Sequence, residues 1–551
     1  MEKQLFDNTN QEEPIKYNNS SYSIVTPILL ALFLVLGFFA GKFFTQRNIQ
    51  KTQMFSSVSS NTSNKLFAIF DVIKENYVDS LSEEEIIEKS IPEILAQLDP
   101  HSVYIPAQQM QAATEPLHGK FEGIGVQFNL QNDTIVVIQT ISGGPSEKVG
   151  IMAGDRIVTI NDSVFAGVKT TNENIIKHLK GEKGSKVKVG IKRKGFKDLL
   201  HFNITRDEIP LYSVDVAYMV DNEIGYVKVS KFAETTYDEF IEAVEKLKTQ
   251  GMKKIILDLR GNGGGYMSAA TGIADEFLEK GKMIVYTEGR FRPRQDYKAT
   301  SKNSLLNIET VVLIDAWSAS ASEIVAGALQ DNDIGTIVGQ RTFGKGLVQE
   351  SMSFPDGSGL RITTARYYTP TGRSIQKPYG KNTDYEHELS ERYMNGEFMH
   401  LDSTHFVDSL KFTTPKGKVV YGGGGIAPDV FVPRDTTGYS HYFGKLVSKG
   451  VIYQFAFEYA DNHRKDLIKY KTGKELNTKL EASNLMPQFI AYAEKKGIST
   501  NTKELAISRS IINTQLKAYI ARNIIDNDGF YPIIQEIDNV LNEGIKVLRK
   551  K

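Results

Sequence analysis

Three hydroxyl side chains lie where an expected strand passes into an expected helix. The apolar run at 310–315 is followed by Ala-Trp-Ser-Ala-Ser-Ala-Ser-Glu and then by small residues. A sharp turn at such a junction can present a hydroxyl beside the free N–H groups of the helix start, as in a nucleophile elbow. The serines can equally cap the helix, which needs only one of them, most naturally Ser322 or Ser320. The pattern alone leaves both roles open.

A glycine-rich turn follows a second expected strand. Residues 255–259 are apolar around one aspartate and run into Arg-Gly-Asn-Gly-Gly-Gly. Glycines let the backbone approach a ligand closely, and N–H groups at a helix start suit a phosphate or a developing oxyanion. A P-loop needs a Lys-Ser/Thr pair after its glycines, and none is present; the G-x-G-x-x-G spacing is also not met. An oxyanion site and a plain tight turn remain.

A lysine between two glycines follows a third expected strand, in Thr-Phe-Gly-Lys-Gly-Leu-Val-Gln at 342–349. Lysines on loops are usually solvated. To act as a base, a lysine with an ordinary pKa of about 10.4 must lose its charge near neutral pH. Desolvation can lower a lysine pKa by about 3 to 5 units, and Phe343, Leu347 and Val348 can supply an apolar wall. Ser-Lys pairs are a known variant of the catalytic triad.

The composition narrows the chemistry further. The chain has no cysteine, which removes thiol nucleophiles, disulfides and Cys-based zinc sites. None of its nine histidines occupies a motif that fits a Ser-His-Asp reading. Basic and acidic residues balance at 66 each, without a basic run, so nucleic acid is not an expected partner. We therefore expect an oxygen nucleophile and neither a metal nor another cofactor.

The motifs D-L-R-G-N-G-G-G, S-A-S-A-S-E and F-G-K-G-L-V-Q, in this order, resemble those of the C-terminal processing peptidases, or tail-specific proteases. Further matches are L-D-P-H-S-V-Y at 98–104, Y-T-P-T-G-R at 368–373 and G-G-I-A-P-D-V at 424–430, so the resemblance covers roughly residues 65–433. It implies a serine endopeptidase in which Ser320 is the nucleophile, Lys345 the base and Gln349 the residue that orients the lysine.

The same resemblance implies an oxyanion hole. It would combine the N–H of Ala321 with that of Gly263 or Gly264, without deciding between the two glycines. Asp331 matches a position with an auxiliary role in some relatives, although the end of a helix explains it equally well.

Residues 121–128, Phe-Glu-Gly-Ile-Gly-Val-Gln-Phe, resemble the carboxylate-binding loop and adjoining strand of PDZ domains, and 154–158 resemble their G-D-x-I segment. This implies that a substrate tail adds as a strand and that its carboxylate meets backbone N–H groups of Gly123, Ile124, Gly125 and Val126. Its pockets would select apolar C-termini. A PDZ module that acts only as a spacer or gate is the alternative, and gating is compatible with recruitment.

The elements around these motifs give the fold class. Strand and helix alternate from about 223 to 432, with helices expected at 236–249, 267–279 and 322–330, which predicts an α/β core. Residues 119–205 predict a β-rich module with one helix at 171–179. Helical patterns follow at 485–495, 503–525 and 531–548. These patterns predict a multidomain α/β protein with a helical C-terminal region. The resemblance implies that its core is a crotonase/Clp-protease-like protease fold and that the inserted β-rich module is a PDZ domain.

Residues 24–41 carry no charge, which is long enough to span a bilayer and predicts one transmembrane anchor over 24–44; a cleaved signal peptide is the alternative. The basic residues that flank the segment favour a cytoplasmic C-terminal side. A location in the bacterial inner membrane, with the catalytic body in the periplasm, therefore rests on the resemblance.

We expect the following organisation: an N-terminal tail (1–23), the anchor (24–44), a flexible stalk (45–64), a helical part of the protease body (65–118), the PDZ domain (119–205), the Ser-Lys core (206–435) and a helical domain of unknown role (436–551). Expected partners are protein substrates with apolar C-termini, the membrane, and a regulatory partner or further copies of the chain. The rival function is a non-catalytic PDZ scaffold on a protease-derived body.

Overall fold

The computed structural model describes residues 61–131, 133–380, 383–385, 387–400 and 407–550, and the single positions 31, 35, 37 and 42. The chain divides into two units, 1–90 and 91–551. Apart from those four positions, the predicted tail and anchor lie outside the described residues. Among the described residues, no helix combines the length and apolar character needed to cross a bilayer.

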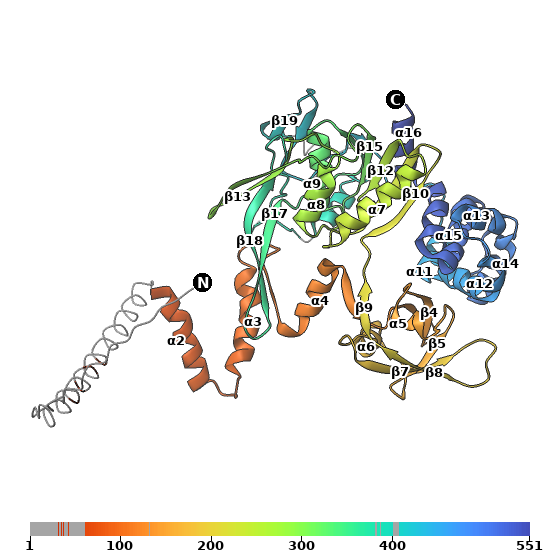
Figure 1. Ribbon diagram of the computed structural model, residues 1–551, viewed down its shortest axis with the longest axis horizontal. Helices are drawn as coiled ribbons and strands as arrows, with labels where there is room; N and C mark the ends of the chain where they lie inside the picture. Colours follow the sequence, from red (N-terminus) through yellow and green to blue (C-terminus); the bar gives the residue numbers. More distant parts are fainter. Residues whose placement is uncertain are drawn as a thin grey trace, which may run out of the picture. The chain divides into compact units, whose positions relative to one another are not determined.

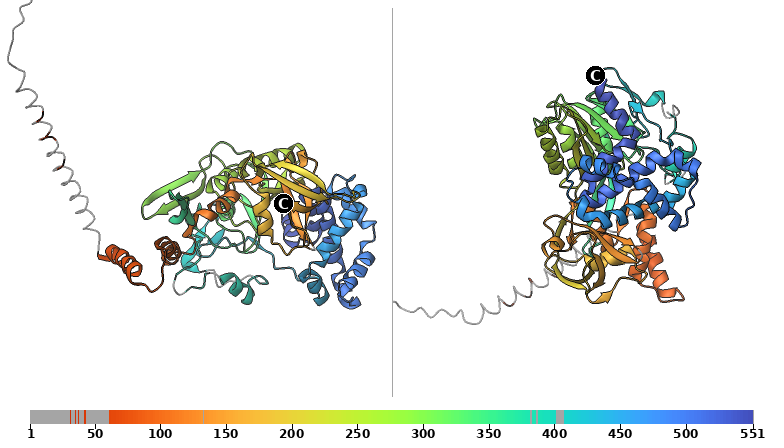
Figure 2. Two further views of the ribbon diagram at one scale, coloured as in Figure 1. Left: turned by 90° about the horizontal axis from the view of Figure 1, so that it is seen from below. Right: turned by 90° about the vertical axis from the view of Figure 1, so that its right-hand side faces the viewer.

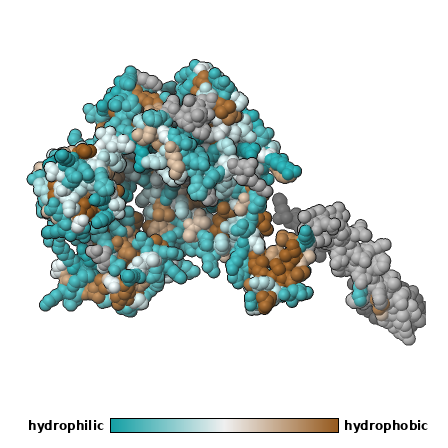
Figure 3. Space-filling model, turned by 180° about the vertical axis from the view of Figure 1, so that it is seen from behind, coloured by the Kyte–Doolittle hydropathy of each residue, from teal (hydrophilic) through white to brown (hydrophobic). Residues whose placement is uncertain are grey.

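The described part of the first unit is helical. Helix α2 (Asn61–Asn76) is followed by α3 (Glu83–Leu95), which continues into the second unit. The last four residues of the predicted stalk, 61–64, therefore belong to helix α2. They are polar, so the apolar pattern of the helix does not mark its start. Helix α2 leaves Leu66, Phe67 and Val72 about half or more exposed. Figure 3 shows that hydrophobic residues gather in patches on the surface of the molecule.

The PDZ-like module is a twisted antiparallel sheet with one helix. Its strands are β3 (Val126–Gln131), β4 (Thr134–Thr140), β5 (Arg156–Ile160), β7 (Lys186–Lys192) and β8 (Leu200–Thr205), in that order, with β6 (Ser163–Val164) beside β5. Helix α6 (Asn172–Leu179) packs Ile175 into the core, and the short helix α5 (Pro145–Lys148) follows β4. Strands β2 (Lys120–Gly123) and β9 (Asp207–Pro210) pair where the chain enters and leaves the module.

A six-stranded sheet forms the protease-like core. Its strand order is β10 (Val214–Met219), β11 (Ile224–Val229), β12 (Lys254–Asp258), β15 (Glu309–Ile314), β16 (Gly335–Gly339) and β21 (Val430–Phe431). Only β10 runs antiparallel to its neighbour. Because β12, β15 and β16 are parallel, their carboxyl ends meet at one edge, where the glycine turn, the serines and the lysine loop begin.

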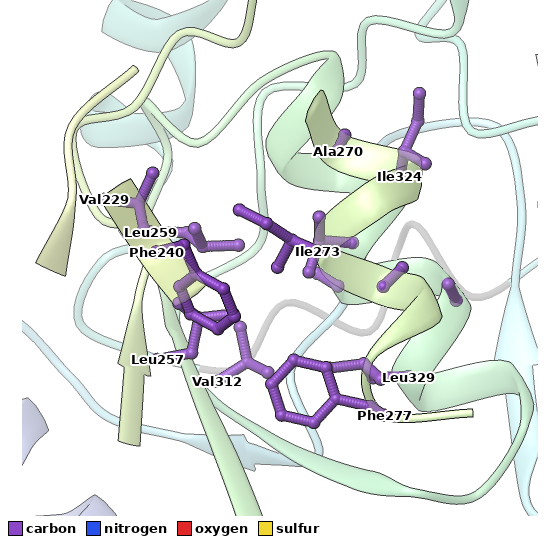
Figure 4. Close-up of a cluster of buried hydrophobic side chains, with 14 of the residues drawn as sticks. Val229, Phe240, Leu257, Leu259, Ala270, Ile273, Phe277, Val312, Ile324 and Leu329 are labelled. Atoms are coloured by element: carbon purple, nitrogen blue, oxygen red, sulfur yellow. The ribbon is translucent and has the colours of Figure 1, made fainter. Parts of the chain in front are cut away.

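Helices cover both faces of this sheet. On one face lie α7 (Thr236–Thr249), α8 (Met267–Asp275) and α9 (Ala321–Asp331), as Figure 1 shows. Helix α8 ends four residues before the predicted end at 279. Figure 4 shows Phe240, Ile273 and Phe277 facing Leu257 and Val312 of the sheet; all five are fully buried.

The opposite face is covered by the last helix, α16 (Asn539–Arg549). Its Leu541, Ile545 and Leu548 pack with Val311 and Leu313. The single helix predicted over 531–548 is wrong. Helix α15 (Thr502–Ile534) ends first, a 3₁₀ turn follows (η3, Gln535–Ile537), and the Asp538 side chain caps α16 by accepting the N–H of Leu541 at 3.0 Å.

A second, antiparallel sheet, which we did not predict, carries the strand that follows the lysine loop. Its strands are β1 (Val103–Ile105), β18 (Gly359–Tyr368), β13 (Met283–Gly289) and β14 (Arg292–Lys298), with β17 (Leu347–Ser353) on the other edge of β18. Helix α4 (Ala107–His118) links β1 to the PDZ-like module, and beyond β18 lie α10 (Glu388–Met394), η2 (Asp408–Leu410) and the hairpin of β19 (Lys411–Thr413) and β20 (Val419–Tyr421).

The C-terminal helices build a core of their own. They are α11 (His441–Ser448), α12 (Val451–Leu467), α13 (Gly473–Glu481), α14 (Leu485–Lys495) and α15, and they form one blue cluster in both views of Figure 2. Their buried side chains include Phe443, Phe489 and Ile512. Helix α16 is the exception within the predicted 436–551 domain, because it packs on the protease-like sheet.

Candidate active site

Ser320 occupies a strained backbone position between β15 and α9. Its φ is 56° and its ψ −111°, a region that costs a non-glycine residue about 1 to 3 kcal/mol. Two buried partners hold it there. Its N–H donates to the Glu323 carboxylate at 2.8 Å, and its carbonyl accepts from the Tyr367 hydroxyl at 3.1 Å. The sharp turn expected of a nucleophile elbow is thus present at this serine.

The two neighbouring serines are buried and use their hydroxyls in hydrogen bonds to backbone carbonyls. Ser318 and Ser322 are fully buried, and their hydroxyls donate to the carbonyls of Leu259 and Asn262, each at 2.8 Å. Ser320 is the N-cap residue of α9 and is only partly buried. Of the three serines, it is the one whose side chain reaches the surface.

The glycine turn packs directly against this elbow. Gly264 has φ +103°, and a Cβ there would lie 2.8 Å from the Cβ of Ser320, so only glycine fits. The Gly264 N–H donates to Asn262 Oδ1 at 2.9 Å. In the described part of the chain, neither Gly263 nor Ala321 has an acceptor for its N–H, so they are the better pair of candidate oxyanion donors.

The lysine loop meets the same group of residues. Lys345 is partly buried, its Nζ donates to Gln349 Oε1 at 2.9 Å, and its carbonyl accepts from the Tyr367 hydroxyl at 2.6 Å. Burial lowers the pKa of Lys345, and the positive charge of Arg361 lowers it further, against the opposing charges of Asp99 and Glu323. The environment therefore favours the neutral amine that a base requires.

Glu323 connects the two loops and was missed as a site residue. Its side chain is fully buried and accepts four hydrogen bonds: from the N–H groups of Ser320, Gly344 and Lys345 at 2.8 to 2.9 Å and from the Thr342 hydroxyl at 2.5 Å. Burial raises its pKa to about 7 although all four donors favour the carboxylate. The sequence signal was only a glutamate three residues after the cap, which is typical of any capping box.

Gln349 is held at both ends of its amide. The oxygen accepts from Lys345, and the Nε2 donates to the backbone carbonyl of His101. The imidazole of His101 lies against Tyr385, and burial, with the nearby Lys345 and Lys377, lowers its pKa to about 4. The His101 ring is therefore neutral near neutral pH and adds no positive charge near Lys345.

Asp331 lies at the other end of α9. Over the 11 residues of that helix, about 1.5 Å each, it is roughly 17 Å from Ser320 along the axis. It forms a fully buried ion pair with Arg373 at 2.7 Å and accepts from the Thr371 hydroxyl at 2.7 Å. These contacts anchor the 369–373 loop, and the structure does not bring Asp331 to the serine and lysine.

The predicted carboxylate-binding loop borders a groove in the PDZ-like module. The cavity has a volume of about 380 Å³ and lies between β3, an edge strand of its sheet, and α6. Gly123, Ile124, Gly125 and Val126 line it, together with Phe121, Gln127, Phe128, Asn172, Ile176, Leu179 and Lys180. An open strand edge beside an apolar pocket is the geometry that accepts an added peptide strand.

Comparison with known families gives three matches along the chain. The model of peptidase family S41 matches residues 223–387, and the PDZ domain model matches 123–204. A family of unknown function, DUF8443, matches residues 442–526, within the C-terminal helices.

Curated relatives match most of this length. A carboxy-terminal-processing protease of Bartonella bacilliformis is 35% identical over 413 residues, which cover 73% of this chain and 92% of the relative. The carboxy-terminal processing protease CtpA of Bacillus subtilis is 33% identical over 354 residues, 64% of this chain and 74% of the relative. A solved photosystem II D1 C-terminal processing protease aligns with 25% identity, a TM-score of 0.33 and coverage of 68% of this chain and 94% of that one.

Proposed function

Because this chain belongs to peptidase family S41, as a serine-type C-terminal processing peptidase with a PDZ domain, we propose that Ser320 is its nucleophile and Lys345 its general base. The observation that carries the proposal is the shared anchoring of the two residues. The carboxylate of Glu323 and the hydroxyl of Tyr367 each bind the backbone of both.

In this mechanism the neutral amine of Lys345 accepts the hydroxyl proton as Ser320 Oγ attacks the scissile carbonyl carbon. The oxyanion is stabilised by the N–H groups of Ala321 and Gly263. The protonated lysine then gives its proton to the leaving amine, and an acyl ester remains on Ser320. Water, deprotonated by the same lysine, hydrolyses the ester.

The PDZ groove supplies the substrate. We propose that an unstructured tail adds to the free edge of β3, with its terminal carboxylate at the 123–126 loop and an apolar side chain near Ile176. Proteins with apolar C-termini are therefore the expected substrates. We further propose that residues 24–44 anchor the chain in the membrane and that the body lies in the periplasm, as the family resemblance implies; protease accessibility in spheroplasts would test this.

The test is cleavage of an unfolded protein with an apolar C-terminal tail by the purified protein, wild type beside Ser320→Ala and Lys345→Ala. Turnover by the wild type, its loss in both variants and weaker cleavage of a tail-amidated substrate support the proposal. A wild type that binds the tail without cleaving it supports the scaffold alternative. Full activity in Lys345→Ala would contradict the Ser-Lys mechanism within an intact peptidase.

A further inference from the structure

Residues 99–102, called the Asp99 turn below, are far in sequence from the motifs of the proposed reaction. They nevertheless contact Gln349 of β17 through the His101 carbonyl. Asp99 is 9% exposed. Its Oδ1 accepts from the N–H groups of His101 and Ser102 at 2.9 and 3.0 Å, and its Oδ2 accepts from the Ser102 hydroxyl at 2.6 Å. One buried carboxylate thus fixes the backbone of this turn, as an Asx turn does.

The Asp99 turn docks on β18 at Thr363. The Thr363 N–H donates to Ser102 Oγ and its hydroxyl to Asp99 Oδ1, both at 3.1 Å. Immediately after the turn, β1 pairs with β18, with Val103 opposite Arg361. Thr363 is also the register partner of Gln349 across β17 and β18. A single residue of β18 therefore sets the position of the turn against Gln349.

The contact between the turn and Gln349 decides which end of the amide faces the lysine. A primary amide has one accepting oxygen and a donating NH₂ group. The His101 carbonyl takes a hydrogen bond from Nε2, which leaves Oε1 to accept from Lys345 Nζ at 2.9 Å. With the amide reversed, its oxygen would face the carbonyl oxygen of His101, and its NH₂ group would occupy the lone pair of a neutral Lys345 amine. The carbonyl therefore selects the orientation in which the amine donates one N–H to Gln349 and keeps its lone pair free.

We propose that Asp99 is a positioning residue for catalysis: through the His101 carbonyl it orients the Gln349 amide, which in turn orients the Lys345 amine toward Ser320. The inference rests on the Ser-Lys reaction proposed above. Asp99 contacts no reacting atom in this account. Its effect passes through one backbone carbonyl and one amide, so it disappears when the amide is removed.

A purely electrostatic role gives the opposite sign. The charges that act on Lys345 are Arg361, which lowers its pKa, and Asp99 and Glu323, which raise it; the His101 ring is neutral near neutral pH. Removal of the Asp99 charge would therefore make Lys345 a neutral amine at lower pH and raise activity there. Loss of positioning instead lowers activity at every pH.

The experiment is a double-mutant cycle of Asp99→Ala and Gln349→Ala in the full chain, with kcat and KM measured across about pH 6 to 9. Misplacement of a catalytic group by about 1 Å costs about 100-fold, so we expect Asp99→Ala to lower kcat by about 10- to 100-fold with little change in KM. In the Gln349→Ala background the same substitution should change kcat by less than about 3-fold. Asp99→Asn, which keeps one acceptor oxygen, should recover part of the rate.

Asp356→Ala is the matched control. Asp356 Oδ1 accepts from the N–H and hydroxyl of Ser358 at 2.9 and 2.7 Å in the loop between β17 and β18, so its carboxylate also shapes a turn of the same hairpin. The Gln349 amide instead bonds to Lys345 and to the carbonyl of His101 in the Asp99 turn. Wild-type kcat is expected. If Asp99→Ala does not fold, Ser102→Ala removes the hydroxyl that donates to Asp99 and accepts from Thr363, but it keeps the N–H bonds of the turn to Asp99. It should give a smaller loss that also vanishes without Gln349.

The possible results distinguish failure of the Asp99 positioning role from failure of the Ser320–Lys345 mechanism. Equal losses from Asp99→Ala in both backgrounds, or a wild-type kcat in the single variant, would overturn the positioning role while the Ser-Lys mechanism stands. A wild-type protein that neither cleaves nor reacts at Ser320 with a serine-directed probe would overturn the mechanism and this inference together.

Discussion

Glu323 accepts a hydrogen bond from the backbone N–H of Lys345 at 2.9 Å, although the two residues lie on loops that follow different strands. The same carboxylate oxygen accepts the N–H of Ser320 at 2.8 Å. The proposed nucleophile and base are thus fixed to one buried group, which sets the spacing of their backbones before any substrate arrives.

Replacing Glu323 with Gln tests this coupling. Each carboxylate oxygen accepts two bonds: Oε2 from the N–H groups of Ser320 and Lys345, and Oε1 from Gly344 N–H and the Thr342 hydroxyl. Whichever oxygen becomes NH₂ in the amide, at least one N–H of the lysine loop loses its acceptor. We expect kcat to fall by at least about 10-fold, with Ser320 still present and the fold retained. Wild-type kcat in Glu323→Gln would contradict the linking role.

The titration of Glu323 predicts how stability changes with pH. Burial raises its folded-state pKa to about 7 from an ordinary value of 4.5. Between those values the folded state binds more protons than the unfolded state, so this group's contribution to the free energy of unfolding falls as pH rises. Urea unfolding at about pH 5 and about pH 8 should show a smaller decline in Glu323→Gln than in wild type. Equal declines would place the pKa of Glu323 in its ordinary range.

The pH dependence of catalysis should report Lys345. Protonation of the lysine removes the base, so kcat/KM should rise with pH through the lowered pKa of the free enzyme. Because Arg361 contributes to that lowering, Arg361→Gln should move the acid limb to higher pH. A limb that stays in place in this variant would show that another group controls it.

The packing of Gly264 against Ser320 predicts a steric requirement. In Gly264→Ala the new Cβ would lie 2.8 Å from Ser320 Cβ and 2.9 Å from the carbonyl oxygen of Ala319, at a φ of +103°. Displacement of the elbow should lower kcat by about 100-fold. Gly263→Ala keeps its N–H and meets open space, so its loss should be much smaller. Equal losses in the two variants would argue against close packing at Gly264.

Tail capture can be separated from chemistry at the PDZ groove. Ile176 lines the groove and is 41% exposed, whereas Val164 is 58% exposed and lies outside it. Burying one apolar side chain is worth about 1.5 to 3 kcal/mol, so Ile176→Ser should raise KM for an apolar-tailed substrate by about 10-fold or more. Val164→Ser should leave KM unchanged. An equal KM in all three proteins would exclude the groove as the tail site.

The sequence predicted the α/β core well because its strands are apolar runs and its helices carry strong periodicity. Helix α7 was placed at its observed ends, and the family resemblance drawn from three motifs is confirmed by the S41 match. The antiparallel sheet was missed, since β14 is mostly exposed and β17, Leu-Val-Gln-Glu-Ser-Met-Ser, lacks the apolar–polar alternation of a strand. That sheet carries Gln349 and receives the Asp99 turn, so contacts that depend on it were not predictable from local patterns.

The helical region shows a different limit. The break at Asp538 is invisible in periodicity, because apolar residues recur on both sides of it. Asp538 caps α16 through a local bond from Leu541 N–H, and it also makes a tertiary contact, to the Arg260 guanidinium at 2.7 Å beside the glycine turn. A residue near the C-terminus thus supports Arg260, which is also paired with the fully buried Asp258.

The most direct test of the central claim is covalent labelling of the nucleophile. A serine-directed acylating probe, followed by peptide mass spectrometry, should place the adduct on Ser320 in wild type. General base catalysis contributes about 10²- to 10⁴-fold, so Lys345→Ala should label at least about 100-fold more slowly. An adduct on another residue, or labelling of Lys345→Ala at the wild-type rate, would contradict a Ser320 nucleophile activated by Lys345.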